Sequence, residues 1–117
     1  MGLFDALGIS STGLTAQRLR MDVTAENLAN AQSVGYKRKD VDFHDALAAA
    51  AGSGESPGSV GFAAQDDSSA PVRADGNSVD ADKENSELAQ NALEYDALAR
   101  VASARIDILK TAMGVAQ

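Results

Sequence analysis

The stretch SELAQNALEYDALARVASARIDILKTAM, from Ser86 to Met113, decides the fold. Apolar or aromatic residues recur along it at alternating spacings of four and three residues, which is a heptad pattern and indicates one long helix with an apolar seam. The seam residues are Leu88, Ala92, Tyr95, Ala99, Ala102, Ile106, Leu109 and Met113. A second stripe, which comprises Leu98, Val101, Ile108, Ala112 and Val115, lies beside the seam, so the helix is predicted to have two apolar faces.

The ends of this helix follow from its flanking residues. Asp80 or Asp82 is suited to cap its N-terminus, where a carboxylate also favours the positive end of the helix dipole. Lys110 suits the opposite end, and Gly114 is expected to end or fray the helix. At about 1.5 Å per residue, this helix would span roughly 50 Å.

A first helix is predicted from Ser11, or from as early as Phe4, to Ala29. Its apolar stripe repeats every seven residues, at Leu7, Leu14, Met21 and Leu28. Gly8 and Gly13 weaken its beginning, since each costs roughly 1 kcal/mol relative to alanine inside a helix. We therefore expect its first turns to fray.

The middle of the chain has a different pattern. Residues 36–43 have no helical stripe and are typical of an extended segment, and the following FHDALAAAA can form a short helix. Residues 51–71 are rich in Gly, Ser and Ala and form a loop. We therefore assign residues 1–35 to an N-terminal helical segment, 36–79 to an extended arm and loop, and 80–117 to the C-terminal long helix.

The predicted fold is mostly α. It is an elongated antiparallel pair of N- and C-terminal helices, coiled-coil-like, with an extended, partly β or irregular middle. One helix would be longer than a 117-residue globule is wide, so spare apolar surface remains, and such surface predicts assembly with other chains. A closed hairpin or dimeric coiled coil, acting as a small adaptor or secreted partner-binding protein, is the alternative.

The composition argues against several classes of function. The chain has no cysteine, so it offers no disulfide and no thiol nucleophile, and it has no apolar run long enough for stable membrane insertion. The net charge is −7, and most of the deficit lies in residues 48–117, with five Lys/Arg and eleven Asp/Glu. This balance repels a phosphate backbone, so we expect no nucleic-acid partner.

No group of residues indicates an enzyme. GESPG, at residues 54–58, matches the G-x-S-x-G pattern of hydrolases, but it lies in a loop, and the only histidine, His44, precedes it. DGNSVDADKE, at residues 75–84, gathers acids but lacks the glycine spacing of an EF-hand, and it is typical of a turn followed by a helix cap. We predict no catalytic residue, no metal ligand and no cofactor.

Two stretches resemble flagellar axial proteins, the family of rod, hook and hook–filament junction subunits. The first is ENLANAQSVGYKR, which has the family's N-L/I-A-N helix end followed by GY, and its matching residues are Asn27, Leu28, Ala29, Asn30, Gly35 and Tyr36. The second is DGNSVDADKENSELAQNALEYDAL, which is similar to one proximal rod subunit, and its matching residues are Gly76, Asn77, Val79, Asp80, Asp82, Glu84, Leu88, Ala89, Asn91, Tyr95 and Leu98. The opening GLFDALGISSTGLTAQ looks more like a sibling rod subunit, so the C-terminal half decides between the two.

The resemblance implies a structural subunit of the bacterial flagellar basal body, in the proximal rod that crosses the periplasm. Its terminal helices would polymerise with other copies of the chain and with other rod proteins. Inner-membrane ring and export-gate components would be its partners at the rod base. The N-terminus shows no signal-peptide pattern, which fits a family exported by the flagellar type III system without a cleaved signal peptide.

We expect the subunit interfaces to include the apolar stripes and the N-x-x-N turn. The predicted interface residues are Leu14, Met21, Asn27, Leu28, Asn30, Gly35, Tyr36, Leu88, Tyr95, Leu98, Ile106, Leu109 and Met113. Asn27 and Asn30 share one helix face and can fix the angle between helix and arm at a subunit contact; alternatively, Asn30 is an ordinary cap and Asn27 a solvated residue. The cations at 37–39 are predicted to be solvated or to pair with acids in residues 75–87, including those of another subunit.

Overall fold

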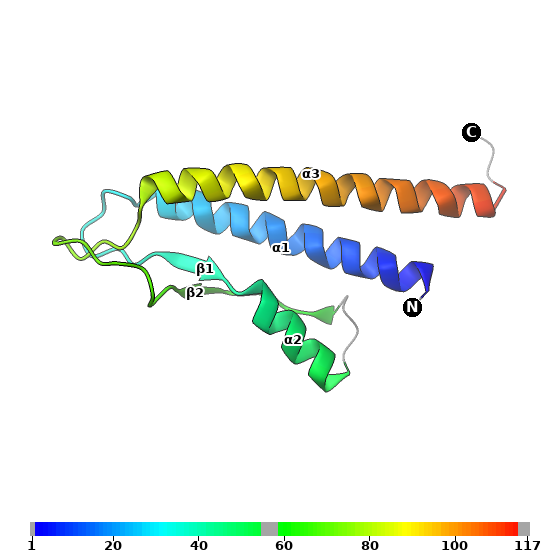
Figure 1. Ribbon diagram of the computed structural model, residues 1–117, viewed down its shortest axis with the longest axis horizontal. Coiled ribbons are helices and arrows are strands. Elements are labelled where there is room, and N and C mark those ends of the chain that lie inside the picture. The colour runs from blue at the N-terminus through cyan, green and yellow to red at the C-terminus, as the bar shows by residue number, and fades with distance from the viewer. Residues whose placement is uncertain (1, 55–58, 115–117) are drawn as a thin grey trace.

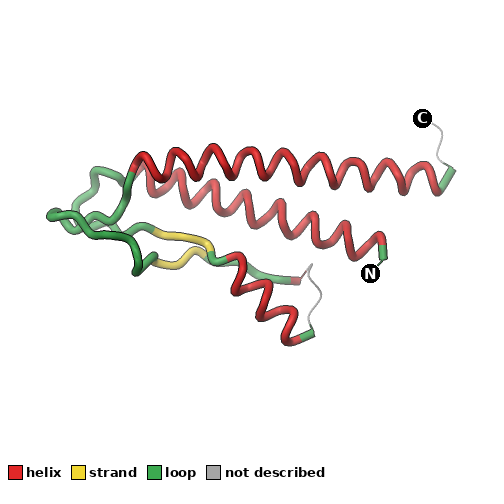
Figure 2. The backbone as a smooth tube through the Cα atoms, viewed as in Figure 1, coloured by secondary structure: helices red, strands yellow, loops and turns green. Residues whose placement is uncertain are grey.

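The structure is a computed structural model that describes residues 2–54 and 59–114. Figure 1 labels the helices and strands, and Figure 2 shows the loops that join them. In chain order the elements are α1 (Leu3–Ala29), β1 (Lys39–Val41), α2 (Phe43–Ser53), β2 (Ala64–Asp66) and α3 (Ala81–Ala112). The mostly helical fold class is confirmed.

The molecule is long and thin. Helices α1 and α3 lie side by side and antiparallel, so that both chain ends are at one end of the long axis and the loops are at the other (Figure 1). The principal extents are 62 × 34 × 14 Å, and the radius of gyration is 17.7 Å, whereas a compact domain of this length would have a radius of about 13 Å. The predicted elongated pair of terminal helices is therefore present.

Helix α1 begins at Leu3, earlier than Ser11, and neither of its glycines interrupts it. The Asp5 carboxylate accepts a hydrogen bond from the Gly2 backbone N–H (2.9 Å), which stabilises the first turn. Gly13 lies where α1 and α3 approach closely, because a Cβ built there would be 3.2 Å from Leu98 Cδ1. Gly13 therefore admits the Leu98 side chain between the helices.

The face that α1 buries is mostly small or polar. Its buried residues are Ser10, Thr12, Gly13, Ala16, Gln17, Val23, Thr24 and Asn27. The residues of the predicted heptad stripe are half-buried, so part of each side chain stays at the surface of the helix pair. This face is covered by α3 along the helix and, near Asn27, by β1.

Helix α3 is rotated relative to the predicted seam. The two residues that it buries are Glu84 and Asn91, and Leu98, seven residues further along, contacts α1 at Gly13. Ile106 and Met113, which belong to the predicted seam, are exposed. Near its start the helix is turned so that Glu84 meets a buried arginine, described below. Further along, the seam residues Leu88, Ala99, Ala102 and Leu109 are half-buried.

The predicted ends of α3 are confirmed. Asp80 is the N-cap, and its carboxylate accepts hydrogen bonds from the backbone N–H groups of Asp82 and Lys83. The helix ends at Ala112, and Gly114 follows in the left-handed region, at φ +69°. Residues 115–117, which include Val115 of the second predicted stripe, lie outside the described residues.

The middle segment forms an arm. Strands β1 and β2 pair antiparallel, with Lys39 opposite Asp66 and Val41 opposite Ala64, so the extended segment predicted at residues 36–43 contains a strand. The short helix predicted after it is α2, which diverges from the α1–α3 pair (Figure 1). Near its start the Phe43 ring stacks on the Phe62 ring, with centroids 5.2 Å apart.

The two glycines inside α1 provide a matched test of the close helix contact. Gly8→Ala should raise the free energy of unfolding by about 0.5–1 kcal/mol, because a Cβ at that position meets no atom within 4 Å. Gly13→Ala should gain less, because its Cβ presses on Leu98. Urea unfolding monitored by circular dichroism measures both values, and an equal or larger gain for Gly13→Ala would contradict this packing.

Candidate functional site

The centre of the molecule is a polar cluster at the loop end of the helix pair, which we call the junction. It consists of Asn27, Arg38, Asn77 and Glu84, which are the largest fully buried side chains among the described residues. The buried apolar residues are small by comparison: Ala16, Val23, Ala31, Val41 and Val79. Polar interactions at the junction therefore fix how α1, α3 and the arm are placed relative to one another.

Arg38 binds carboxylates from two elements. Its side chain is 2% exposed, and its Nε donates to the Oε1 of Glu84, which is 0% exposed. Its Nη1 donates to Asp67 (2.8 Å) and its Nη2 to Glu87 (2.6 Å). The guanidinium thus joins the arm to the first turns of α3 within one chain. Of the cations at 37–39, Arg38 is the one that pairs with acids of residues 75–87 in the described chain, whereas Lys39 pairs with Glu26.

Asn27 uses every hydrogen-bonding position of its amide. Its Nδ2 donates to the Lys39 carbonyl oxygen (2.8 Å) and to Glu84 Oε2 (3.1 Å). Its Oδ1 accepts from the Lys39 backbone N–H (3.0 Å) and from the Tyr36 hydroxyl (3.2 Å). The amide pairs with the outer edge of β1 as a neighbouring strand would. It therefore does fix the angle between helix and arm.

Asn30 and Asn77 close the end of α1. The Asn30 side chain donates to the Glu26 carbonyl (2.9 Å), as an ordinary cap does. The Asn77 Nδ2 donates to the carbonyls of Asn30 (2.9 Å) and Ser33 (2.8 Å), and Arg73 donates to the Ala31 carbonyl (2.6 Å). The carbonyls that a helix end leaves without partners are satisfied by the segment that precedes α3.

Two glycines allow this segment to approach the turn after α1. Gly35 and Gly76 both have positive φ, +74° and +82°, and a Cβ at Gly76 would lie 3.2 Å from the Gly35 Cα. The Gly35 N–H donates to the Asp75 carbonyl (2.9 Å), and the Ser78 N–H donates to the Tyr36 carbonyl (3.0 Å). Only glycine fits this crossing of two backbones.

The pKa values of Arg38 and Asp67 are shifted by the same contacts. Burial alone would lower the pKa of Arg38, but the hydrogen bond with Glu84 and the charges of Glu84 and Glu87 outweigh burial and raise that pKa further. The pKa of Asp67 is lowered from its usual 3.8, mainly by the hydrogen bond from Ser69 and also by Arg38. The stabilisation from Asp67 is thus present above its unfolded pKa and is lost as the pH falls through its folded pKa.

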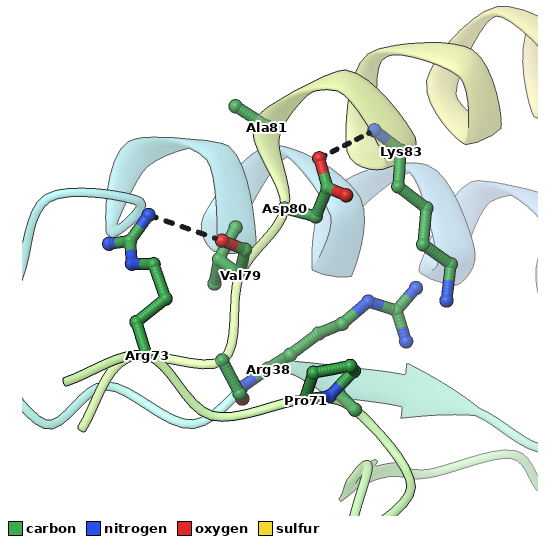
Figure 3. A pocket seen from close by; sticks show the side chains of 9 residues that line it. Arg38, Pro71, Arg73, Val79, Asp80, Ala81 and Lys83 are labelled. Atoms are coloured by element: carbon green, nitrogen blue, oxygen red, sulfur yellow. Dashed lines mark hydrogen bonds between the residues drawn. The ribbon is translucent and has the colours of Figure 1, made fainter.

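A cavity of about 370 Å³ opens beside the junction, between the first turn of α3 and the loop before it. Figure 3 shows the side chains that line it. Its apolar lining comes from Ala70, Pro71, Val79 and Ala81, and its cations are Arg38, Arg73 and Lys83. Ser78 and Asp80 complete the lining. All three cations have partners: Arg38 binds carboxylates, Arg73 donates to the Ala31 carbonyl, and Lys83 lies 3.8 Å from Glu87.

The structure separates the predicted interface residues into three groups. Asn27 is buried inside the chain, 1% exposed, so the alternative that it is solvated is wrong. The half-buried residues are Leu14, Met21, Leu28, Asn30, Tyr36, Leu88, Leu98 and Leu109. The exposed residues are Gly35, Tyr95, Ile106 and Met113.

Sequence reasoning missed the junction as a site. The sequence feature that could have predicted it is the basic run at residues 37–39 together with the acids at 75–87, since dense opposite charges favour ion pairs. Nothing in the pattern showed that Arg38 and Glu84 would be buried while Lys37 and Lys39 remain at the surface.

The described residues offer little for catalysis. They contain no group of three or more His, Cys, Asp or Glu side chains that could hold a metal ion. His44 is exposed and contacts Phe43 edge-on. Of the GESPG segment, residues 55–58 lie outside the described part of the chain. No helix among the described residues is long and apolar enough to cross a membrane.

An elongated helix pair, held by a buried polar junction and with large apolar side chains exposed along it, is typical of a structural protein. The family model for flagella basal body rod proteins matches residues 7–37. The rod protein FlgB of Cereibacter sphaeroides is 32% identical over 124 aligned positions, which cover 96% of each chain. FlgB of Aeromonas hydrophila is 33% identical over 92% of each chain. The chain belongs to the FlgB family of flagellar basal body rod proteins.

Matches to a sibling rod protein are shorter. FlgC of Borrelia hermsii is 49% identical over 49 residues, which cover 37% of this chain and 83% of that relative. The predicted family is thus confirmed, and so is the preference, based on the C-terminal half, for one rod subunit over its sibling.

The buried arginine makes the first prediction for the junction. Arg38→Ala should lower the free energy of unfolding by about 3–5 kcal/mol, because it leaves Glu84 buried without its cation. The control is Arg100→Ala, since Arg100 forms a fully exposed ion pair with Asp96 (2.8 Å) on the same helix as Glu84 and should change stability little. If urea unfolding gave the same loss of unfolding free energy for both variants, the buried ion pair would contribute no more to stability than the exposed one.

The two asparagines make the second prediction. Asn27→Ala should lower the free energy of unfolding by at least about 2 kcal/mol and speed hydrogen exchange at the Lys39 amide, because it orphans both backbone groups of that residue. Asn30→Ala should cost about 1 kcal/mol or less and leave that amide protected. Unchanged exchange at Lys39 in Asn27→Ala would rule out the proposed support of β1.

Proposed function

We propose that this chain is a structural subunit of the flagellar basal body rod and that it polymerises through the outward faces of α1 and α3. The observation that carries the proposal is the distribution of apolar side chains. Among the described residues the largest fully buried side chains are polar, whereas large apolar residues on both helices are exposed. A polymer would cover the surface that the subunit leaves open.

The clearest outward face is on α3. Leu93 follows the buried Asn91 by two residues, and therefore lies about 200° round the helix from it. Val101 and Ile108 follow Leu93 at spacings of eight and seven, so the three share one face, and all three are exposed. We call this the outer stripe; the alanines at 97 and 104 lie between its members and are exposed as well.

Other predicted interface residues flank this stripe or the helix pair. Tyr95, Ile106 and Met113 are exposed on α3, and the half-buried leucines of α1 form part of the surface beside α3. Asn27 contributes indirectly, because it sets the direction of the arm from inside the subunit. We propose that neighbouring subunits pack against these faces and not against the junction.

The proposed partners are further copies of the chain and other rod proteins, since the relatives are named as rod proteins of the FlgB and FlgC kinds. Contacts with inner-membrane ring and export-gate components at the base of the rod, and type III export without a cleaved signal peptide, belong to the same proposal. The proximal position in the rod is supported by the resemblance of the C-terminal half.

A charge in the outer stripe tests the proposal. Val101→Asp should raise the concentration needed for assembly at least tenfold, because an ionised carboxylate would have to be desolvated in the contact. A tenfold change corresponds to a loss of about 1.4 kcal/mol of association free energy. Sedimentation of the purified chain, alone and with other rod proteins, measures assembly, and motility of a strain that relies on the variant measures it in cells.

Ser103→Asp is the matched control, because it adds the same charge at an exposed polar position on the same helix, off the outer stripe. It should assemble as the unmodified chain does. Equal assembly of Val101→Asp and the unmodified chain would remove the stripe as an interface. A fixed small stoichiometry at all concentrations would favour a closed adaptor over a rod subunit.

A further inference from the structure

The two-stranded sheet of the arm has two edges, and the described part of the chain closes one of them. Strand β1 lies between α1 and β2 (Figure 1). On the edge of β1 that faces α1, the Asn27 amide accepts a hydrogen bond from the Lys39 N–H and donates one to the Lys39 carbonyl. A side chain therefore takes the place of a neighbouring strand there. The outer edge of β2 has no such cover among the described residues.

The pairing of β1 with β2 decides which backbone groups face that outer edge. Along an antiparallel ladder, pairs that exchange hydrogen bonds alternate with pairs that do not. Lys39 lies opposite Asp66, but both backbone groups of Lys39 bind Asn27, so this pair exchanges no hydrogen bonds. The N–H and C=O of Asp66 therefore face away from β1.

The same alternation leaves the backbone of Ala64 open. Ala64 lies opposite Val41, two residues along each strand from the previous pair, so its N–H and C=O also face the outer edge. Every residue of β2 is exposed, and no hydrogen bond from the described residues reaches these outward groups. An edge with free N–H and C=O groups can pair with an extended segment of another chain.

The side chains beside this edge are acidic. The cation that reaches them among the described residues is Arg38, which binds Asp67 and lies 3.8 Å from Asp40, while its other donors bind α3. A groove of about 210 Å³ lies beside the edge and is lined by Asp40, Asp42, Gln65, Asp66, Asp67, Ser68 and Ser69.

The remaining carboxylates of the groove keep their charge unbalanced. Lys39 lies opposite Asp66 in the ladder, but its ammonium group is 3.4 Å from Glu26 of α1. Asp42 accepts a hydrogen bond from the Asp45 N–H (3.0 Å), and Asp45 brings a further carboxylate to the start of α2. Neither Asp42 nor Asp66 has an ion-pair partner among the described residues. The edge of β2 therefore favours a segment that carries positive charge.

We propose that the outer edge of β2 binds an extended segment of another protein as a third strand, and that this segment carries lysine or arginine residues that face the groove. Hydrogen bonds to the backbone of Ala64 and Asp66 supply the pairing, and opposite charge selects the segment. A second copy of this chain is disfavoured, because pairing β2 with itself brings the acids of the two copies together. The contact is separate from the faces of α1 and α3 through which the chain is proposed to polymerise, and it does not rest on that proposal.

Amide hydrogen exchange, measured by NMR on the whole chain, tests the added strand. The probes are two short peptides, one that alternates lysine with valine and one that alternates glutamate with valine. The lysine peptide should slow exchange at the Ala64 and Asp66 amides, which face outward. It should leave the Gln65 amide unchanged, because that amide already faces β1. The glutamate peptide should slow none of them.

Two substitutions separate backbone pairing from charge. Ala64→Pro removes an outward donor and keeps every charge, as proline on a sheet edge can, and should weaken binding of the lysine peptide about tenfold. Continued protection of the Asp67 amide, which donates to the Arg38 carbonyl, shows that β1 and β2 remain paired in this variant. Asp66→Asn keeps the backbone, removes one charge and should weaken binding roughly two- to fivefold.

Asp107→Asn is the matched control, because Asp107 is exposed on α3, away from the arm, and has no ion-pair partner among the described residues. It removes the same charge and should bind the lysine peptide as the unmodified chain does. A loss equal to that of Asp66→Asn would mean that only the net charge of the chain attracts the peptide, and it would overturn the proposed site.

Three further results would overturn the proposal. The first is that the lysine peptide fails to bind, or saturates the chain without slowing exchange at Ala64 and Asp66. The second is that the glutamate peptide binds equally well. The third is protection of these two amides with rising protein concentration and no peptide, which would make a second copy the occupant. None of these results bears on polymerisation, which the comparison of Val101→Asp with Ser103→Asp tests separately.

Discussion

The architecture depends on one buried guanidinium. Arg38 is the only cation at the junction that is fully buried among the described residues, and it is held by carboxylates from the arm and from α3. Removing an arginine from water is costly unless its donors are satisfied, so the side chain can be inside only when Glu84, Glu87 and Asp67 are in place. The positions of the arm and of α3 are therefore determined together.

That requirement explains the unusual rotation of α3. Glu84 must face inward to meet Arg38 and Asn27. Asn91 and Leu98 follow it at successive spacings of seven residues, about two helical turns each, so they also face α1. The apolar residues on the opposite side are then left outside. Neither predicted apolar face is buried as a whole: Leu88 of the seam and Leu98 of the second stripe are half-buried, whereas Ile106 and Ile108 are exposed.

The sequence was sufficient for the features that depend on local spacing. The two terminal helices, the Asp80 cap and the extended segment before α2 each follow from residues close together in the chain. It was insufficient for the rotation of α3, because the heptad pattern does not say which apolar face meets α1. The two asparagines have different roles: Asn30 caps α1, whereas Asn27 is buried and binds Lys39 and Glu84. Spacing could not separate them, because the burial of Asn27 depends on where Lys39 and Glu84 lie in space. The charges at 37–39 likewise predicted an ion pair with the acids at 75–87, but not that Arg38 and Glu84 would be buried in it.

The smallness of the buried apolar residues has a thermodynamic consequence. The heat-capacity change of unfolding scales with the apolar surface that becomes exposed, and the described core contributes only alanine and valine side chains. The isolated subunit should thus have a shallow curve of stability against temperature. In the proposed polymer, the step in which exposed leucine, isoleucine and phenylalanine side chains leave water would carry the larger heat-capacity change, and assembly would be more sensitive to temperature than the folding of a single chain.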